Sequence, residues 1–140
     1  MNQILSYSLI ALTSAAILLL LIAGPLGVVF REIDARIVSS AEWSVGGAIS
    51  NCVSAVIGGG SCCAKAFTPV ELVVECRGGE VSVWDNETEI EFSVEFPVEV
   101  ELLSGEVYPW HPDGKVALVR GVVSVSASWV EDHVALRVGG

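Results

Sequence analysis

The stretch ILSYSLIALTSAAILLLLIAGPLGVVF, residues 4–30, decides the fold of this chain. The first thirty residues hold no Asp, Glu, Lys, Arg or His. As a helix rising about 1.5 Å per residue, the run reaches about 40 Å, against roughly 30 Å of bilayer hydrocarbon. Only a helix satisfies its own backbone hydrogen bonds in lipid. We therefore expect residues 1–30 to be a transmembrane helix, rather than the core helix of a soluble domain.

Two observations bear on processing and orientation. A cleaved secretory signal is disfavoured, because no Lys or Arg precedes Arg31 and the apolar run is longer than a signal's apolar region of about 7–15 residues. Arg31 and Arg36 follow the segment, and counting positive charges alone places the next region in the cytoplasm. Four cysteines and the sequon that begins at Asn86 favour an oxidising exterior instead. We expect the remainder of the chain to lie outside the cell, with Asn86 a candidate N-glycosylation site.

Charge restricts the choice of partners. The 140 residues include seven Lys plus Arg against seventeen Asp plus Glu, for a formal net charge of −10. An excess of negative charge repels phosphate backbones, so nucleic-acid binding is disfavoured. Once the apolar segment is set aside, the remaining length suffices for one modest folded domain.

The helix is predicted to continue past Phe30 as an amphipathic segment, residues 31–57. Nothing in the sequence between Phe30 and Arg31 would end it, so one continuous helix is expected from about Gln3 to Ile57. Gly58 and the two glycines after it end the helix, because three glycines cost too much backbone entropy to continue. Glu42 is assigned to the surface. Apolar residues recur every four positions and are expected to pack the helix on the rest of the domain: Ile33, Ile37, Ala41, Val45, Ile49 and Val53.

The period then changes from helical to alternating. Residues 58–69 are interpreted as a connector and residues 70–140 as a β-domain of six or so short antiparallel strands. The clearest strand covers residues 90–102, with apolar residues on one face and glutamates on the other, and Pro97 is expected to bend it. Residues 108–114 are interpreted as a rigid loop. The predicted class is α+β: a long hydrophobic-then-amphipathic helix followed by a small antiparallel β-sandwich or sheet head.

The four cysteines, Cys52, Cys62, Cys63 and Cys76, are not spaced in Cys-x-x-Cys pairs, which disfavours a zinc site. Four thiols allow three pairings. A bond between the adjacent Cys62 and Cys63 would be strained, whereas one bond from the helix end to the connector and another from the connector to Cys76 would join helix and sheet. Buried free thiols are the alternative.

No motif supports an enzyme. His111 lies in the predicted loop and His133 begins a predicted strand, and neither falls in a GxSxG or HExxH pattern. An anchored hydrolase would need one of these histidines. The glutamate face lacks a calcium-binding loop sequence and is interpreted as a solvated acidic face. The sequence therefore predicts no catalytic residue, no metal site, no cofactor and no small-molecule substrate.

The layout resembles type IV pilin-like proteins, in particular archaeal pilins and archaellins. The resemblance rests on architecture, with Ile4 to Ile57 as the helix and Val70 to Val138 as an all-β head, and on no diagnostic motif; Leu5 stands where many pilins have Glu. It implies a ladle-shaped subunit whose apolar helix rests in the membrane before assembly and afterwards packs against its copies. It also fits the archaellum-associated envelope proteins that pair one N-terminal helix with a β-sandwich.

The sequence and this resemblance together predict a structural subunit of an extracellular, pilus-like filament at the cell surface. Its partners would be copies of itself or related pilins, and the membrane before assembly. The alternative is a single-pass anchored envelope protein whose β-domain binds a surface-layer or filament partner. The residues expected in the filament core or membrane are Ile4, Leu5, Leu9, Leu12, Ala16, Leu20, Ile22 and Val28.

Overall fold

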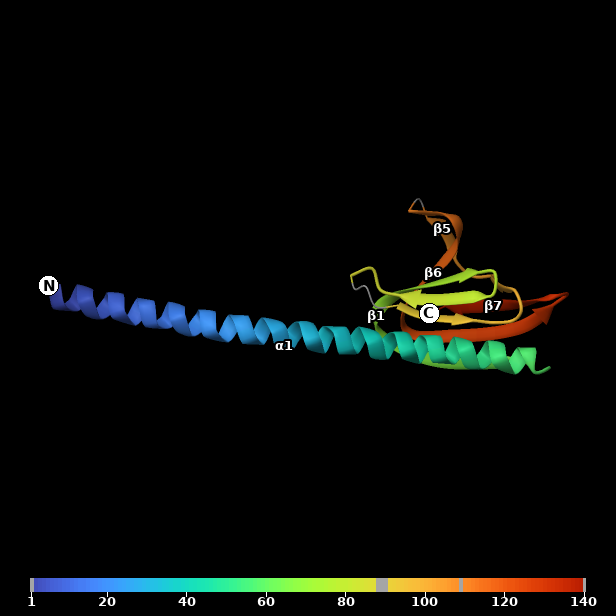
Figure 1. Cartoon of the computed structure of the whole chain (residues 1–140), viewed down its shortest axis with the longest axis horizontal. Helices are drawn as coiled ribbons and strands as arrows, with labels where there is room; N and C mark the ends of the chain where they lie inside the picture. Colours follow the sequence, from blue (N-terminus) through green and yellow to red (C-terminus); the bar gives the residue numbers. More distant parts are fainter. Residues whose placement is uncertain (1, 88–90, 109, 140) are drawn as a thin grey trace. The chain divides into compact units, whose positions relative to one another are not determined.

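The computed structural model describes the backbone of residues 2–87, 91–108 and 110–139. Helix α1 runs from Asn2 to Ile57 and is followed by a β-sheet (Figure 1). The chain divides into two compact units, Met1–Arg36 and Ile37–Gly140, with the boundary inside α1. The described part of the first unit, residues 2–36, is helix alone. The second unit, which we call the head, contains the last turns of α1 and the whole sheet.

The end of α1 falls where the glycines were predicted to stop it. Gly59 adopts a positive φ of 99°, a left-handed conformation that favours glycine. The N–H groups of Gly58 and Gly60 donate to the Ser54 and Ala55 carbonyls at 3.0 Å, which satisfies acceptors left over at the helix end. The Trp129 indole Nε1–H donates to the Val56 carbonyl at 2.6 Å, so the sheet also caps the helix.

The head contains one curled, mixed sheet, a half-barrel, and the predicted α+β class with a helix followed by a sheet head is confirmed. The order of strands is β3-β2-β1-β6-β7-β4, with β5 paired to β6. All pairs are antiparallel except β4 with β7, so the antiparallel sandwich is replaced by a single mixed sheet. The strands are β1 Cys62–Arg77, β2 Glu80–Trp84, β3 Glu91–Glu95, β4 Val100–Leu102, β5 Glu106–Tyr108, β6 His111–Val130 and β7 His133–Gly139.

The single strand predicted over residues 90–102 is wrong, because the chain leaves the sheet around Pro97 and the segment becomes two strands. β3 ends at Glu95 and β4 begins at Val100, and these consecutive strands lie at opposite ends of the sheet order. Between them the chain crosses the turn that joins β1 to β2. There the Phe96 N–H donates to the Gly79 carbonyl, and the Val100 N–H donates to the Gly78 carbonyl, both at 2.7 Å. Gly79 has no room for a side chain, because a Cβ there would overlap the Phe96 carbonyl oxygen.

Two strands are longer than predicted. The predicted connector, residues 58–69, is wrong from Cys62 onward, because β1 begins there and pairs with β6. The predicted loop at residues 108–114 is largely replaced by a tight connection, since β5 ends at Tyr108 and β6 begins at His111; Pro109 lies outside the described residues. Gly121, at a positive φ of 78°, does not end β6 but pairs with Thr68 beside a bulge in β1.

The core forms where the final turns of α1 lie on the concave face of the sheet. Alternate residues of each strand face the helix, as the period of two requires. Removing such side chains from water contributes about 1.5–3 kcal/mol each for Val, Leu or Ile, before the entropy of ordering them is subtracted. The largest apolar side chains of this core, all below 2 % exposed, are Val45, Ile49, Val53, Val56, Leu72, Val74, Val81, Val83 and Leu136.

Candidate functional site

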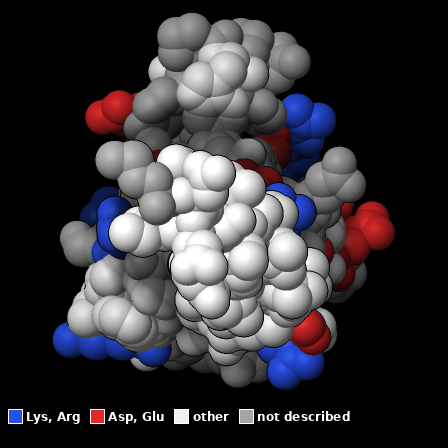
Figure 2. Space-filling view, turned by 90° about the vertical axis from the view of Figure 1, so that its left-hand side faces the viewer, with Lys and Arg blue, Asp and Glu red and all other residues white. Residues whose placement is uncertain are grey.

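Residues 4–30 of the N-terminal unit present a surface that is largely apolar and carries no charge. We define the N-terminal apolar surface as the exposed large apolar side chains of residues 4–30. The N-terminal end of α1, which faces the viewer in Figure 2, carries no Lys, Arg, Asp or Glu colour. By length and composition α1 could cross a membrane or serve as a signal sequence, and its most apolar window is 0 % buried within the chain.

The residues predicted for the filament core or membrane all lie on this surface. Seven of them are large apolar side chains between 52 % and 75 % exposed, and Ala16 is also exposed. The surface has no covering within the described part of the chain. The seven are Ile4, Leu5, Leu9, Leu12, Leu20, Ile22 and Val28.

The residues predicted to pack the helix on the head divide into two groups. Ala41, Val45, Ile49 and Val53 are buried in the core of the head, whereas Ile37 is 40 % exposed and Ile33, in the N-terminal unit, is exposed as well. A repeat of four residues drifts by about 40° at each step around a helix of 3.6 residues per turn, so the six positions cannot share one face.

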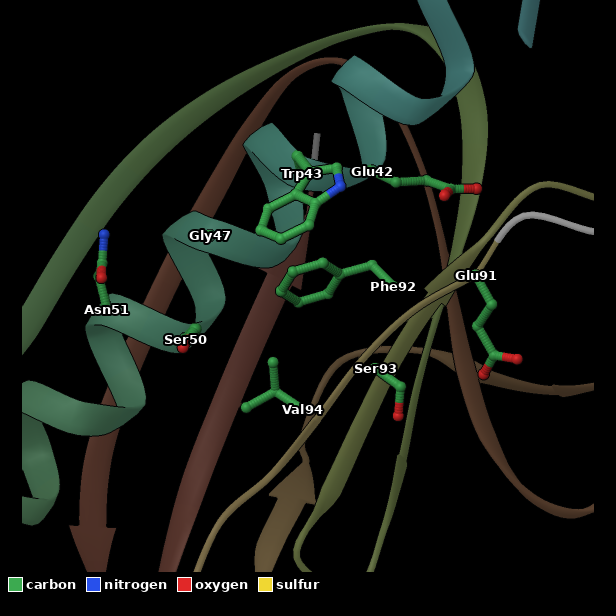
Figure 3. A pocket seen from close by; sticks show the side chains of 9 residues that line it. All are labelled: Glu42, Trp43, Gly47, Ser50, Asn51, Glu91, Phe92, Ser93 and Val94. Atoms are coloured by element: carbon green, nitrogen blue, oxygen red, sulfur yellow. The ribbon is translucent and has the colours of Figure 1, made fainter. Parts of the chain in front are cut away.

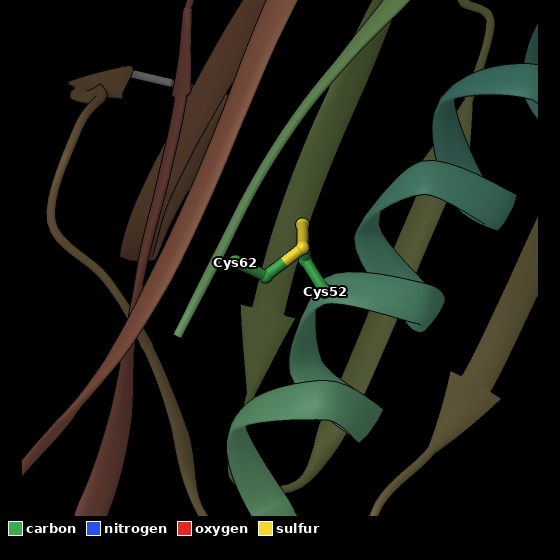
Figure 4. Close-up of a disulfide and its surroundings, with 2 residues drawn as sticks. All are labelled: Cys52 and Cys62. Atoms are coloured by element: carbon green, nitrogen blue, oxygen red, sulfur yellow. A yellow bond between two sulfur atoms is a disulfide. The ribbon is translucent and has the colours of Figure 1, made fainter. Parts of the chain in front are cut away.

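The disulfide prediction is half correct. Cys52 of α1 and Cys62 of β1 form a disulfide that joins helix to sheet (Figure 4). The second predicted bond is wrong, because Cys63 and Cys76 are free thiols at opposite ends of β1. Thirteen residues of extended strand separate them by about 40 Å, far beyond disulfide reach. Burial, and secondarily Glu75, raises the pKa of the Cys76 thiol to about 12.

A groove in the head, between α1 and the edge strand β3, was not predicted from the sequence. It encloses about 410 Å³ and is lined by α1 residues from Glu42 to Asn51 and by β3 residues from Glu91 to Val94 (Figure 3). The Trp43 and Phe92 rings meet edge to face, with centroids 5.2 Å apart. Trp43 is nevertheless 68 % exposed. The groove therefore has an aromatic wall that solvent can reach.

Gly46 is the reason that this wall can form. A Cβ placed on Gly46 would overlap the Phe92 ring, closer than any real contact. Glycine inside a helix lowers stability by about 1 kcal/mol relative to alanine. A glycine at a buried helical position therefore indicates that another group packs closely against the helix backbone there. The sequence contains this signal, but on its own it indicates only a weak point of the helix.

Gly46→Ala is expected to lower the free energy of unfolding by about 1–3 kcal/mol. The added methyl group would overlap the Phe92 ring, and the cost of displacing that ring exceeds the stability gained from the higher helix propensity of alanine. Gly47→Ala is the matched control, since nothing lies within 4 Å of the place its Cβ would take, and it should be neutral or stabilising. Thermal unfolding of the full chain in detergent, followed by near-ultraviolet circular dichroism, measures both. A stabilised Gly46→Ala would contradict the close packing.

Glu42 is the most unusual side chain of the groove. Assigned to the surface from the sequence, it is only 1 % exposed, and its Oε1 has no hydrogen-bond partner among the described residues. Burial raises its pKa to about 7, and the charge of Asp85 and more weakly that of Glu91 add to the rise, while a hydrogen bond from the Asp85 backbone opposes it. The surface assignment was wrong because the sheet covers this part of α1.

The histidines and the sequon lie elsewhere. His133 Nε2 is 2.7 Å from Glu101, and Nδ1 is 3.3 Å from Asp132. The hydrogen bond to Asp132, followed by that to Glu101, raises the His133 pKa. The side chain of His111 lies outside the described residues. Asn86 is exposed, and Thr88 of its sequon is also outside them. Within the described part of the chain, no group of three or more His, Cys, Asp or Glu could hold a metal ion.

No protein-family model, curated protein or solved structure matches this chain.

Proposed function

We propose that this chain is a structural subunit of an extracellular, pilin-like filament, which polymerises through the N-terminal apolar surface. The supporting observation is that residues 4–30 expose almost every large apolar side chain they have. Exposed apolar patches beyond a few hundred Å² mark membrane or protein interfaces. Lipid would cover the surface in the monomer, and helices of other copies would cover it in the filament, at the surface of an archaeal cell.

The organisation into two units also supports this proposal. The head buries its own core and closes the end of α1 with the Cys52–Cys62 disulfide, so it does not need residues 1–36 to complete it. An oxidising exterior is the environment in which such a disulfide persists. A glycan on Asn86 would be compatible with its exposure. The partners in this proposal are copies of the chain or related pilins.

Leu20→Glu is expected to abolish filaments, because every copy would place a carboxylate in an apolar helix bundle without a partner. The remaining apolar residues of the segment should still insert, since one charged residue costs about 3 kcal/mol at a helix centre against many favourable leucines and isoleucines. The expected result is therefore chain in the membrane fraction and no filaments by cryo-electron microscopy of the sheared surface fraction. Ala16→Glu should behave alike.

The control is Ser40→Glu, which adds the same charge at an exposed position of α1 within the head and should leave filaments normal. Normal filaments from Leu20→Glu would count against the proposal. The second candidate, a single-pass anchored envelope protein whose head binds a surface-layer or filament partner, uses the same apolar surface for lipid alone. A wild-type chain that stays monomeric in mild detergent and is missing from sheared filaments would favour that alternative.

A further inference from the structure

We propose that the groove between α1 and β3 binds an organic cation, a primary ammonium or guanidinium group on an apolar stem, with Glu42 as its carboxylate partner. This inference concerns the head alone and goes beyond assembly through the N-terminal apolar surface. It is carried by three features of the groove: a buried carboxylate with one unpaired oxygen, an aromatic wall and a uniformly negative set of charged groups.

The buried carboxylate comes first. Glu42 lines the groove, and its side chain extends from α1 toward the strands (Figure 3). Its Oε1 lacks a hydrogen-bond partner among the described residues, although only 1 % of the residue is exposed. An unpaired buried polar group is unfavourable, and more so when it is charged. A cationic donor would supply the missing partner, so an arrangement that is unfavourable in the empty groove becomes favourable in the occupied one.

The charged groups around Glu42 favour a ligand with a positive charge. Asp85, in the turn after β2, and Glu91, on β3, act on Glu42 from the sheet side, and both are acidic. The three carboxyl groups repel anions and attract cations. A metal ion is a poorer candidate than an organic cation, because no metal-holding group of three or more such side chains is found among the described residues.

The remaining walls fit the apolar part of such a ligand. Trp43 offers an accessible indole, Phe92 lies against it, and Val94 extends the apolar lining. An ammonium or guanidinium group is attracted to the negative face of an indole ring. A volume of about 410 Å³ falls in the range of small-ligand sites, roughly 300–1,000 Å³. Ser50 and Asn51 provide polar groups at the rim.

The test uses the full chain in detergent micelles at pH 8, titrated with n-butylammonium and n-butylguanidinium and observed by two-dimensional NMR of the Trp43 indole N–H and the Gly47 amide. Millimolar dissociation constants are expected for such small ligands, about −4 kcal/mol. n-Butanol and butyrate, which keep the stem but not the positive charge, should bind about tenfold more weakly or not at all. Acetyl-Ala-Lys-Ala-amide is titrated separately to identify where the cation comes from. Binding of this peptide would identify the ligand as a lysine side chain of a partner protein, whereas binding of the free amines alone would identify it as a small molecule.

Variants distinguish the groove from non-specific attraction to an acidic protein. Glu42→Gln should lose about tenfold in affinity for the cations, and Trp43→Ala about threefold to tenfold. Glu71→Gln, which removes an exposed carboxylate of β1, should leave affinity unchanged. At pH 5 the wild type should bind more weakly than at pH 8. Equal affinity in Glu42→Gln, equal binding of n-butanol, or no response to either cation up to about 50 mM would each overturn the proposal.

Discussion

Glu42→Gln is expected to make the head more stable at pH 8, by about 1–3 kcal/mol, and to leave it nearly unchanged at pH 4.5. The Glu42 pKa rises from 4.5 to about 7 on folding, so the folded state holds this proton more tightly than the unfolded state does. The wild type therefore loses stability as the pH rises from about 4.5 to about 7, and the loss is constant above that. One pKa unit corresponds to about 1.4 kcal/mol, so a rise from 4.5 to about 7 sets an upper limit of about 3.5 kcal/mol.

The measurement is thermal or denaturant unfolding of the full chain in detergent at several pH values between 4.5 and 8. The glutamine variant should show a flatter profile over this window, because its amide occupies the same volume without ionising. Glu71→Gln, at an exposed position, serves as the control and should keep the wild-type profile. Identical profiles for Glu42→Gln and the wild type would show that Glu42 is not buried as described.

Breaking the Cys52–Cys62 disulfide is expected to cost about 2–3 kcal/mol. The bond closes a loop over a sequence separation of 10, and in the chain-entropy account a loop of this size restricts the unfolded chain by about that much. Cys52→Ala with Cys62→Ala should lower the melting temperature of the head, and a reducing agent should reproduce the effect in the wild type.

Cys63→Ala is the matched control, because Cys63 is a free, exposed thiol and its loss should leave stability unchanged. Alkylation followed by mass spectrometry gives an independent readout. Cys63 should react first and Cys76 much more slowly, since burial keeps the Cys76 thiol protonated. Four reactive thiols in the non-reduced native chain would contradict the disulfide.

The long helix and the edge strand could be predicted from local patterns. An apolar run without charge, a helical stripe and three glycines fix α1 to within one residue at each end. The alternation around Phe92 and the donor missing at Pro97 mark β3 and its end, but the single strand predicted over residues 90–102 is wrong, because its second half is β4 at the other end of the sheet order. These signals are local because each depends only on neighbours in sequence.

The first half of β1 and the groove depend on long-range contacts and could not be predicted in the same way. Ala64 and Ala66 alternate with more polar residues, but two alanines are too small to indicate a buried strand face by themselves. They pack against the core only because the helix lies close to that part of the sheet. The groove depends on Phe92 meeting Gly46 from a distant part of the chain. Glu42 is also buried only in the folded head, and nothing next to it in the sequence indicates that burial.

The position of β4 has a consequence for how the head folds. β4 pairs in parallel with β7, which follows it by about thirty residues, and β1 pairs with β6 across a separation that reaches about sixty-five. Such distant pairings must close long loops before they contribute stability, which is typical of domains that fold in milliseconds to seconds rather than microseconds. The N-terminal unit contains only neighbouring contacts along a helix and forms far faster. A newly made chain would therefore have its apolar helix ready well before β7 completes the sheet.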